Sequence, residues 1–163
     1  MAGRETGNPG RAKQGGFTLL WALFFVVALG IGMAALGTEW HTLAAREREQ
    51  QLLFVGDQYR QAIAAFRLAS PQGQARYPRS LADLLADPRF ANTVRYLRRP
   101  YPDPVTGRKQ WGLVTDAAGG ITGVYSLSKA KPLKTAGFPI ADKDFEGATS
   151  YRDWVFSAIH APR

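Results

Sequence analysis

An uncharged, apolar stretch from Phe17 to Thr38 is the feature that most constrains how this chain can fold. It contains no Asp, Glu, Lys or Arg, and as a helix it would be about 33 Å long. The hydrocarbon core of a bilayer is about 30 Å thick, so this length predicts a transmembrane helix. Arg4, Arg11 and Lys13 precede the stretch. This positive flank predicts a cytoplasmic N-terminus and an exported body.

The junction between the basic leader and the apolar stretch resembles a known signal. In the segment GRAKQGGFTLLWALFFVVALGIGMAALG, Gly16 precedes Phe17 and an unbroken apolar helix follows. This segment is similar to the class III signal of type IV pilins and type II secretion pseudopilins. The resemblance implies that a prepilin peptidase cleaves after Gly16 and that the new N-terminal residue, Phe17, is N-methylated. The alternative is a cleavable secretory signal, which would have a shorter apolar core followed by a small-residue cleavage site.

One residue departs from the family pattern. Members usually carry a glutamate at the fifth mature position, where it is thought to meet the N-terminal amine of a neighbouring subunit, and this chain has Trp21 there. Within the family this absence is associated with a minor subunit at the filament tip, although Trp21 would also suit an interfacial anchor. Glycines weaken a helix or allow close helix packing. The residues expected to serve assembly are therefore Phe17, Trp21, Gly30, Gly32 and Gly37.

A single long helix is expected, because no Pro occurs from Phe17 through Ser70. Beyond the apolar stretch its apolar positions recur at steps of three or four, which predicts one buried stripe with the charged residues, Glu49 and Arg60 among them, largely outside it. The stripe consists of Leu52, Val55, Tyr59, Ile63 and Phe66.

The expected fold class is α+β and pilin-like: a long N-terminal helix, with a membrane-spanning first half, packed on a small antiparallel β-sheet head. The expected division is a cytoplasmic leader at 1–16, a transmembrane part at 17–38, an amphipathic part at 39–70 and a globular head at 71–163.

Within the head, Ser80 is a predicted N-cap for a short helix from Leu81 to Ala86. Two strands are predicted at 111–115 and 121–127, joined by a glycine-containing loop, and a last strand, which would also suit a helix, at 151–159. The order of a Tyr-Pro pair, a short helix, an Asp-Pro turn and a glycine-rich hairpin resembles the head of the major pseudopilins.

Residues suited to catalysis are sparse. The chain has no Cys, which excludes a thiol nucleophile and a disulfide, and its two histidines, His41 and His160, are far apart in the sequence. No Walker loop, GxSxG motif or dinucleotide fingerprint is present. We therefore do not expect an enzyme.

One acidic segment follows the spacing of a calcium loop. Calcium prefers several hard oxygen ligands from a short, tightly turning segment. Major pseudopilins bind calcium in a C-terminal loop, so the resemblance supports a calcium site, whereas the alternative is a solvated acidic loop. The candidate ligands are Asp142, Asp144, Glu146 and Asp153.

Beyond the leader, the surplus positive charge lies in the head, which contains 14 Lys and Arg residues and 8 Asp and Glu residues. Basic residues interleaved with Tyr96, Tyr101 and Trp111 have a composition that nucleic-acid binders use for phosphate contact and base stacking. We favour the alternative, a basic face that docks neighbouring subunits or keeps the head soluble, over a nucleic-acid partner. The basic residues concerned are Arg95, Arg98, Arg99, Arg108 and Lys109.

Together these features predict a non-catalytic structural subunit, a minor pseudopilin of a type II secretion system. Its expected location is the bacterial inner membrane, with a single pass, a periplasmic head and assembly into a periplasmic filament. The expected partners are prepilin peptidase, other pseudopilins and an inner-membrane assembly platform. The rival hypotheses are a minor pilin of a type IV pilus, with or without DNA binding, and a signal-anchored periplasmic binding or enzymatic module.

Overall fold

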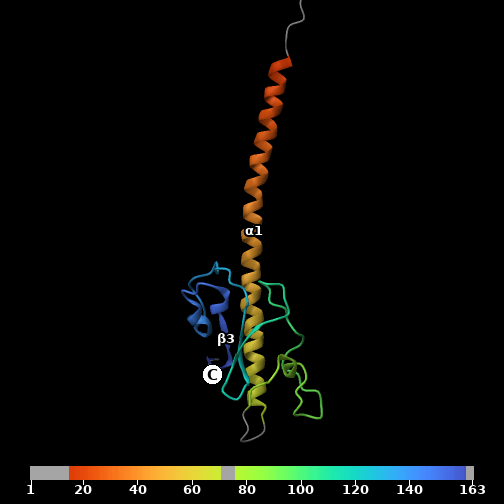
Figure 1. Cartoon of the computed structure of the whole chain (residues 1–163), viewed down its shortest axis with the longest axis vertical. Coiled ribbons are helices and arrows are strands. Elements are labelled where there is room, and N and C mark those ends of the chain that lie inside the picture. The colour runs from red at the N-terminus through yellow and green to blue at the C-terminus, as the bar shows by residue number, and fades with distance from the viewer. Residues whose placement is uncertain (1–14, 71–75, 161–163) are drawn as a thin grey trace, which may run out of the picture. The chain divides into compact units, whose positions relative to one another are not determined.

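The computed structural model describes residues 15–70 and 76–160, with side chains described at 19–28, 42–70 and 76–159. The chain divides into two compact units, Met1–Thr42 and Leu43–Arg163. Helix α1, Gly15–Leu68, contributes residues to both units (Figure 1). Each unit is described by itself below.

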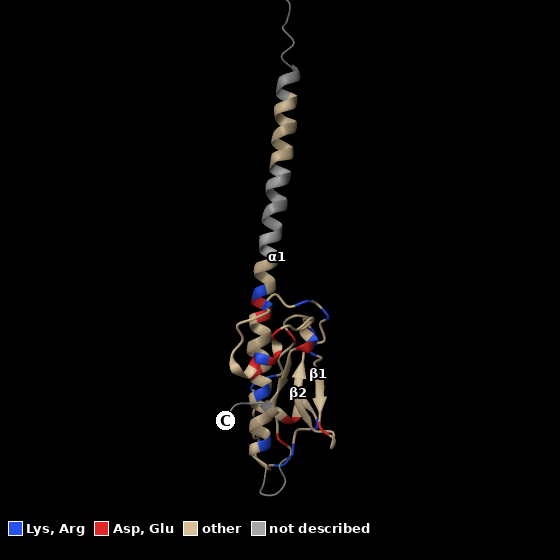
Figure 2. Ribbon diagram, turned by 90° about the vertical axis from the view of Figure 1, so that its left-hand side faces the viewer, with Lys and Arg blue, Asp and Glu red and all other residues tan. Residues whose placement is uncertain are grey.

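In the first unit, residues 19–28 of α1 are apolar and carry no charged residue, in contrast to the helix from Arg46 onward (Figure 2). Across the residues with described side chains, no helix is long and apolar enough to cross a membrane. Residues 19–28 would rise only about 15 Å, roughly half of a bilayer core. The expected membrane-spanning first half of the helix, and with it the expected single-pass inner-membrane location, is therefore wrong.

The second unit contains a three-stranded antiparallel sheet in the order β1-β2-β3. Its strands are β1 at Gly112–Thr115, β2 at Ile121–Tyr125 and β3 at Val155–Ser157. The predicted hairpin is confirmed, and its loop is closed by the Asp116 carboxylate, which accepts hydrogen bonds from the backbone N–H groups of Ala118 and Gly120. Gly119 adopts φ +80° in this loop, a conformation that favours glycine.

Short 3₁₀ helices surround the sheet. The predicted helix after Ser80 is the 3₁₀ helix η1, Leu81–Leu84, with a capping box between Ser80 and Asp83. The predicted last strand is mostly 3₁₀ helix, because η3, Tyr151–Asp153, and η4, Ala158–His160, flank the three residues of β3. A further 3₁₀ helix, η2, occupies Ile140–Phe145.

The core of the second unit lies between α1 and the sheet. All five residues of the predicted stripe are buried, and they join one apolar cluster with Leu84, Trp111, Val124, Trp154 and Phe156. Gly56 is also buried, and a Cβ atom there would overlap the Phe156 ring. The missing side chain lets the helix backbone approach β3 closely.

Candidate functional site

The apolar residues at the start of α1 form the first candidate site. Leu19, Leu20, Trp21 and the apolar residues from Leu23 to Val27 are all at least half exposed. Because successive helical residues are about 100° apart, these side chains surround the helix on every side. A helix that is apolar all round is normally covered by other apolar groups. This segment, residues 19–27, is called the apolar collar below.

The predicted processing and assembly residues lie in α1. Trp21 belongs to the apolar collar, is 57% exposed and makes an edge-to-face contact with Phe24, with 6.1 Å between ring centroids. The helix is continuous through Gly30, Gly32 and Gly37. Gly16 and Phe17 also fall within the bounds of α1. The side-chain surroundings of Phe17, and those around the three glycines, lie outside the described residues, as does the leader before residue 15.

The four predicted calcium ligands serve different contacts. Asp142 accepts a hydrogen bond from Arg60, to which it is also ion-paired, and Asp153 accepts hydrogen bonds from the N–H groups of Thr149 and Ser150. Asp144 and Glu146 are exposed and have no ion pair within the described chain.

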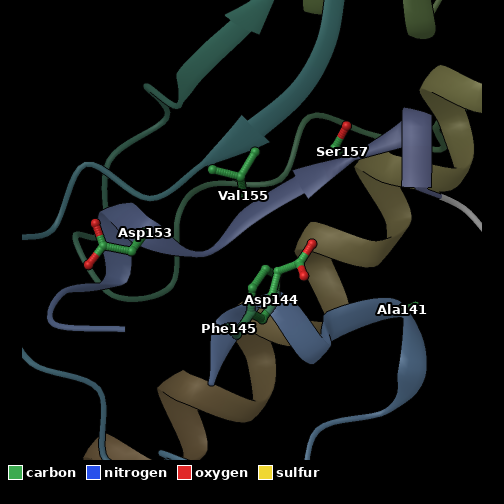
Figure 3. A pocket seen from close by; sticks show the side chains of 6 residues that line it. All are labelled: Ala141, Asp144, Phe145, Asp153, Val155 and Ser157. Atoms are coloured by element: carbon green, nitrogen blue, oxygen red, sulfur yellow. The ribbon is translucent and has the colours of Figure 1, made fainter. Parts of the chain in front are cut away.

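Two of these carboxylates line one pocket. A pocket of about 330 Å³ between η2 and β3 is bordered by Asp144 and Asp153, and their side chains do not point toward one another (Figure 3). Throughout the described residues, no three acidic or histidine side chains gather as a metal site would require. The calcium site remains a prediction, and two of its four carboxylates, Asp144 and Asp153, line the same pocket.

The predicted basic residues are exposed, and three of them lie on one loop. Arg95 and Arg98 line a hollow of about 360 Å³ with Tyr96 and Leu97. The guanidinium of Arg99 lies 5.1 Å from the centroid of the Tyr101 ring. Arg108 and Lys109 follow the turn at Gly107, where φ is +69°. Such side chains can bind anionic groups at the surface.

The interleaved aromatic residues face inward. Trp111 is buried and donates its indole N–H to the carbonyl of Tyr101, at 2.9 Å. Tyr96 donates its hydroxyl to Asp87, and its ring packs edge to face on Phe66. The Tyr101 ring packs edge to face on the Tyr59 ring, with 6.5 Å between ring centroids. These contacts hold rings that the sequence pattern assigned to base stacking.

Several buried charges were not anticipated from the sequence. Glu49 and Arg60 are each 4% exposed, so the expectation that they lie outside the buried stripe is wrong. Arg60 pairs with Asp57 and Asp142 and lies over the Phe156 ring, and Glu49 accepts the backbone N–H of Lys134. A helical wheel places both near the stripe's edge, and each has one hydrogen-bonding partner from a segment more than 80 residues away.

Asp103 and Asp87 organise the loops of the head. Asp103 is fully buried and accepts hydrogen bonds from the hydroxyls of Thr106 and Ser126. The Arg89 guanidinium hydrogen-bonded to Asp87 holds the pKa of that carboxyl below its usual range. The backbone N–H of Ser150 and the hydroxyl of Thr149 likewise lower the pKa of Asp153.

Comparisons of the chain with protein-family models, curated proteins and solved structures found no match. Its own residues and geometry therefore carry any functional inference.

Proposed function

We propose that this chain is a non-catalytic structural subunit of a pilin-type filament, of the pseudopilin kind and in a minor position. Its precursor would be cleaved after Gly16 by a prepilin peptidase, and Phe17 would become the methylated N-terminus. The resemblance of the Gly16-Phe17 junction to the class III signal supports this role.

The single observation that carries the proposal is the exposure of the apolar collar. Its large apolar side chains are 53% to 72% exposed, and full burial of each would contribute about 1.5–3 kcal/mol. Exposed apolar surface of this extent marks an interaction site. In a filament, the helices of neighbouring subunits would cover it.

The difference in burial between two parts of α1 supports the same role. From Leu52 to Phe66 the helix supplies the core of its own head, so that part is already occupied on one side. The collar has no such internal partner within the described residues. One part of α1 therefore packs on its own head, whereas the apolar collar is exposed. This arrangement suits a subunit that binds its neighbours through the collar.

Trp21 supports a minor position. A carboxylate at this place could pair with the N-terminal amine of a neighbour, and removing a partner from a desolvated ion pair costs about 3–5 kcal/mol. Trp21 cannot make this pair. A subunit that lacks this ion pair is better suited to a position in the filament where the pair is not required.

The proposal is tested by co-sedimentation of the full chain with the filament fraction of its own cell. Phe24→Asp combined with Val27→Asp should remove the chain from the sedimented fraction, because two charges would be desolvated between helices. Gln50→Asp, at an exposed polar position of the same helix, is the matched control and should sediment normally. The proposal is contradicted if the unchanged chain does not sediment, or if the collar variant sediments equally well.

A further inference from the structure

The loop that carries Arg95 and Arg98 is rigidly held. The backbone N–H groups of Tyr96 and Leu97 both donate to the carbonyl of Leu84, at 2.9 and 3.0 Å. Leu97 is only 3% exposed, and Tyr96 is fixed through its hydroxyl to Asp87. The two arginines therefore flank an anchored pair and project from a fixed backbone, which lowers the ordering cost of binding.

These cations have no compensating charge in the described part of their own chain. Neither Arg95 nor Arg98 forms an ion pair there. Most of the head's carboxylates already accept hydrogen bonds in caps, turns or buried pairs, namely Asp83, Asp87, Asp103, Asp116, Asp142 and Asp153. The two that do not, Asp144 and Glu146, belong to η2 or follow it directly. In Figure 1 this region lies on the other side of α1 from the segment of residues 80–100.

The kind of partner that would bind this loop can be inferred by comparing three candidates: a second copy of the chain, nucleic acid and an acidic protein. A second copy would bring a head with the same positive surplus, which opposes close association. Nucleic acid would be expected to stack on Tyr96, Tyr101 or Trp111. Tyr96 and Trp111 are held by internal hydrogen bonds, and the Tyr101 ring packs on Tyr59 and beneath Arg99. Guanidinium groups also bind carboxylates in a bidentate manner, so an acidic protein surface fits the loop best.

We propose that Arg95 and Arg98 form a docking site for the carboxylates of a different, acidic subunit of the filament. This inference rests on the proposed function, because that function supplies the neighbouring subunit. The fixed loop sets the spacing of the two guanidinium groups, and the hollow between them accepts the partner's side chains.

The test is a titration of the purified full chain with a fluorescent 20-residue polyglutamate peptide at low salt. Arg95→Glu combined with Arg98→Glu should weaken binding about tenfold, since two exposed charge pairs become repulsive. Lys129→Glu combined with Lys131→Glu changes the net charge equally at other exposed positions and should have a much smaller effect. Circular dichroism checks that both variants stay folded.

Two results would overturn the inference. Equal weakening by both double variants would mean that the peptide senses only the overall positive field. Tighter binding of a 10-base-pair DNA duplex than of the peptide, under the same conditions, would identify nucleic acid as the partner instead. Failure of the filament role would show in co-sedimentation and would leave arginine-dependent peptide binding intact, so the two failures are distinguishable.

Discussion

Arg89 connects three parts of the head through a single side chain. Its guanidinium donates hydrogen bonds to the buried Asp87 carboxylate, to the carbonyl of Phe66, at 2.9 Å, and to the hydroxyl of Ser70. It also lies 3.7 Å from the centroid of the Phe66 ring. The last carbonyls of a helix lack intrahelical donors, so Arg89 satisfies the end of α1 while it neutralises Asp87.

Loss of this arginine should destabilise the head strongly. We expect Arg89→Met to lower the free energy of unfolding by about 2–4 kcal/mol, because Asp87 would be left buried without its cation. Urea denaturation measures the change. Arg95→Met, at an exposed arginine without an ion pair among the described residues, should alter stability by less than about 0.5 kcal/mol. Similar losses in the two variants would contradict this assignment.

The same pair predicts a dependence on pH. Because the pKa of folded Asp87 lies below its usual range, its stabilising effect is complete above the ordinary carboxyl pKa of about 4. It is lost as the pH falls through the lowered value. We expect the urea midpoint to fall on acidification below about pH 4, and to fall less steeply in Asp87→Asn. Parallel pH profiles for the two proteins would show that Asp87 does not contribute.

At the scale of elements, the contact between α1 and β3 depends on the absence of a side chain. In an exposed helix interior, replacing Gly by Ala usually stabilises by about 1 kcal/mol. At Gly56 the added methyl would overlap the Phe156 ring, so we expect Gly56→Ala to destabilise by about 1–3 kcal/mol. Thermal or urea unfolding gives the sign directly.

A second substitution separates overlap from other effects. Phe156→Leu removes ring atoms, so Gly56→Ala should cost less in that background than in the unchanged chain. An equal cost in both backgrounds would mean that the Phe156 ring does not limit the approach of α1.

The sequence predicted elements whose signals are local. The stripe from Leu52 to Phe66, the Ser80 cap and the glycine-containing hairpin follow from periodicity and turn chemistry, and all are confirmed. The pairing of Arg60 with Asp142 could not be anticipated, because it joins residues 82 positions apart. The strand predicted at residues 151–159 is wrong over its first residues, because Ser150 and Asp153 form a capping box that begins a 3₁₀ helix there.

The candidate sites were predicted less well than the elements. The exposure of the basic residues agrees with their composition, but their neighbouring aromatics are turned inward by hydrogen bonds that only the fold provides. The spacing of the acidic loop predicted four carboxylates around one ion. In the structure, Asp142 is ion-paired with Arg60, and Asp153 accepts a hydrogen bond from the backbone. The expected membrane span relied on length and hydropathy alone, and the described helix does not meet that criterion.

At the scale of the whole molecule, the two units carry different contacts. The second unit packs an apolar core between α1 and the sheet, and its buried charged side chains are ion-paired or hydrogen-bonded. The first unit presents the apolar collar, whose side chains remain exposed. In the filament that we propose, other subunits would cover these side chains, and the proposed cleavage after Gly16 would leave Phe17 as the N-terminus.

The most direct test of the filament-subunit proposal is the intact mass of the protein purified from its own cell, with sequencing of its N-terminal peptide. We expect a chain that begins at methylated Phe17, and we expect Gly16→Val to retain the leader, whereas Gly10→Val is processed normally. A native protein that retains Met1 and the whole leader, or one that is cleaved beyond the apolar stretch, would contradict the proposal.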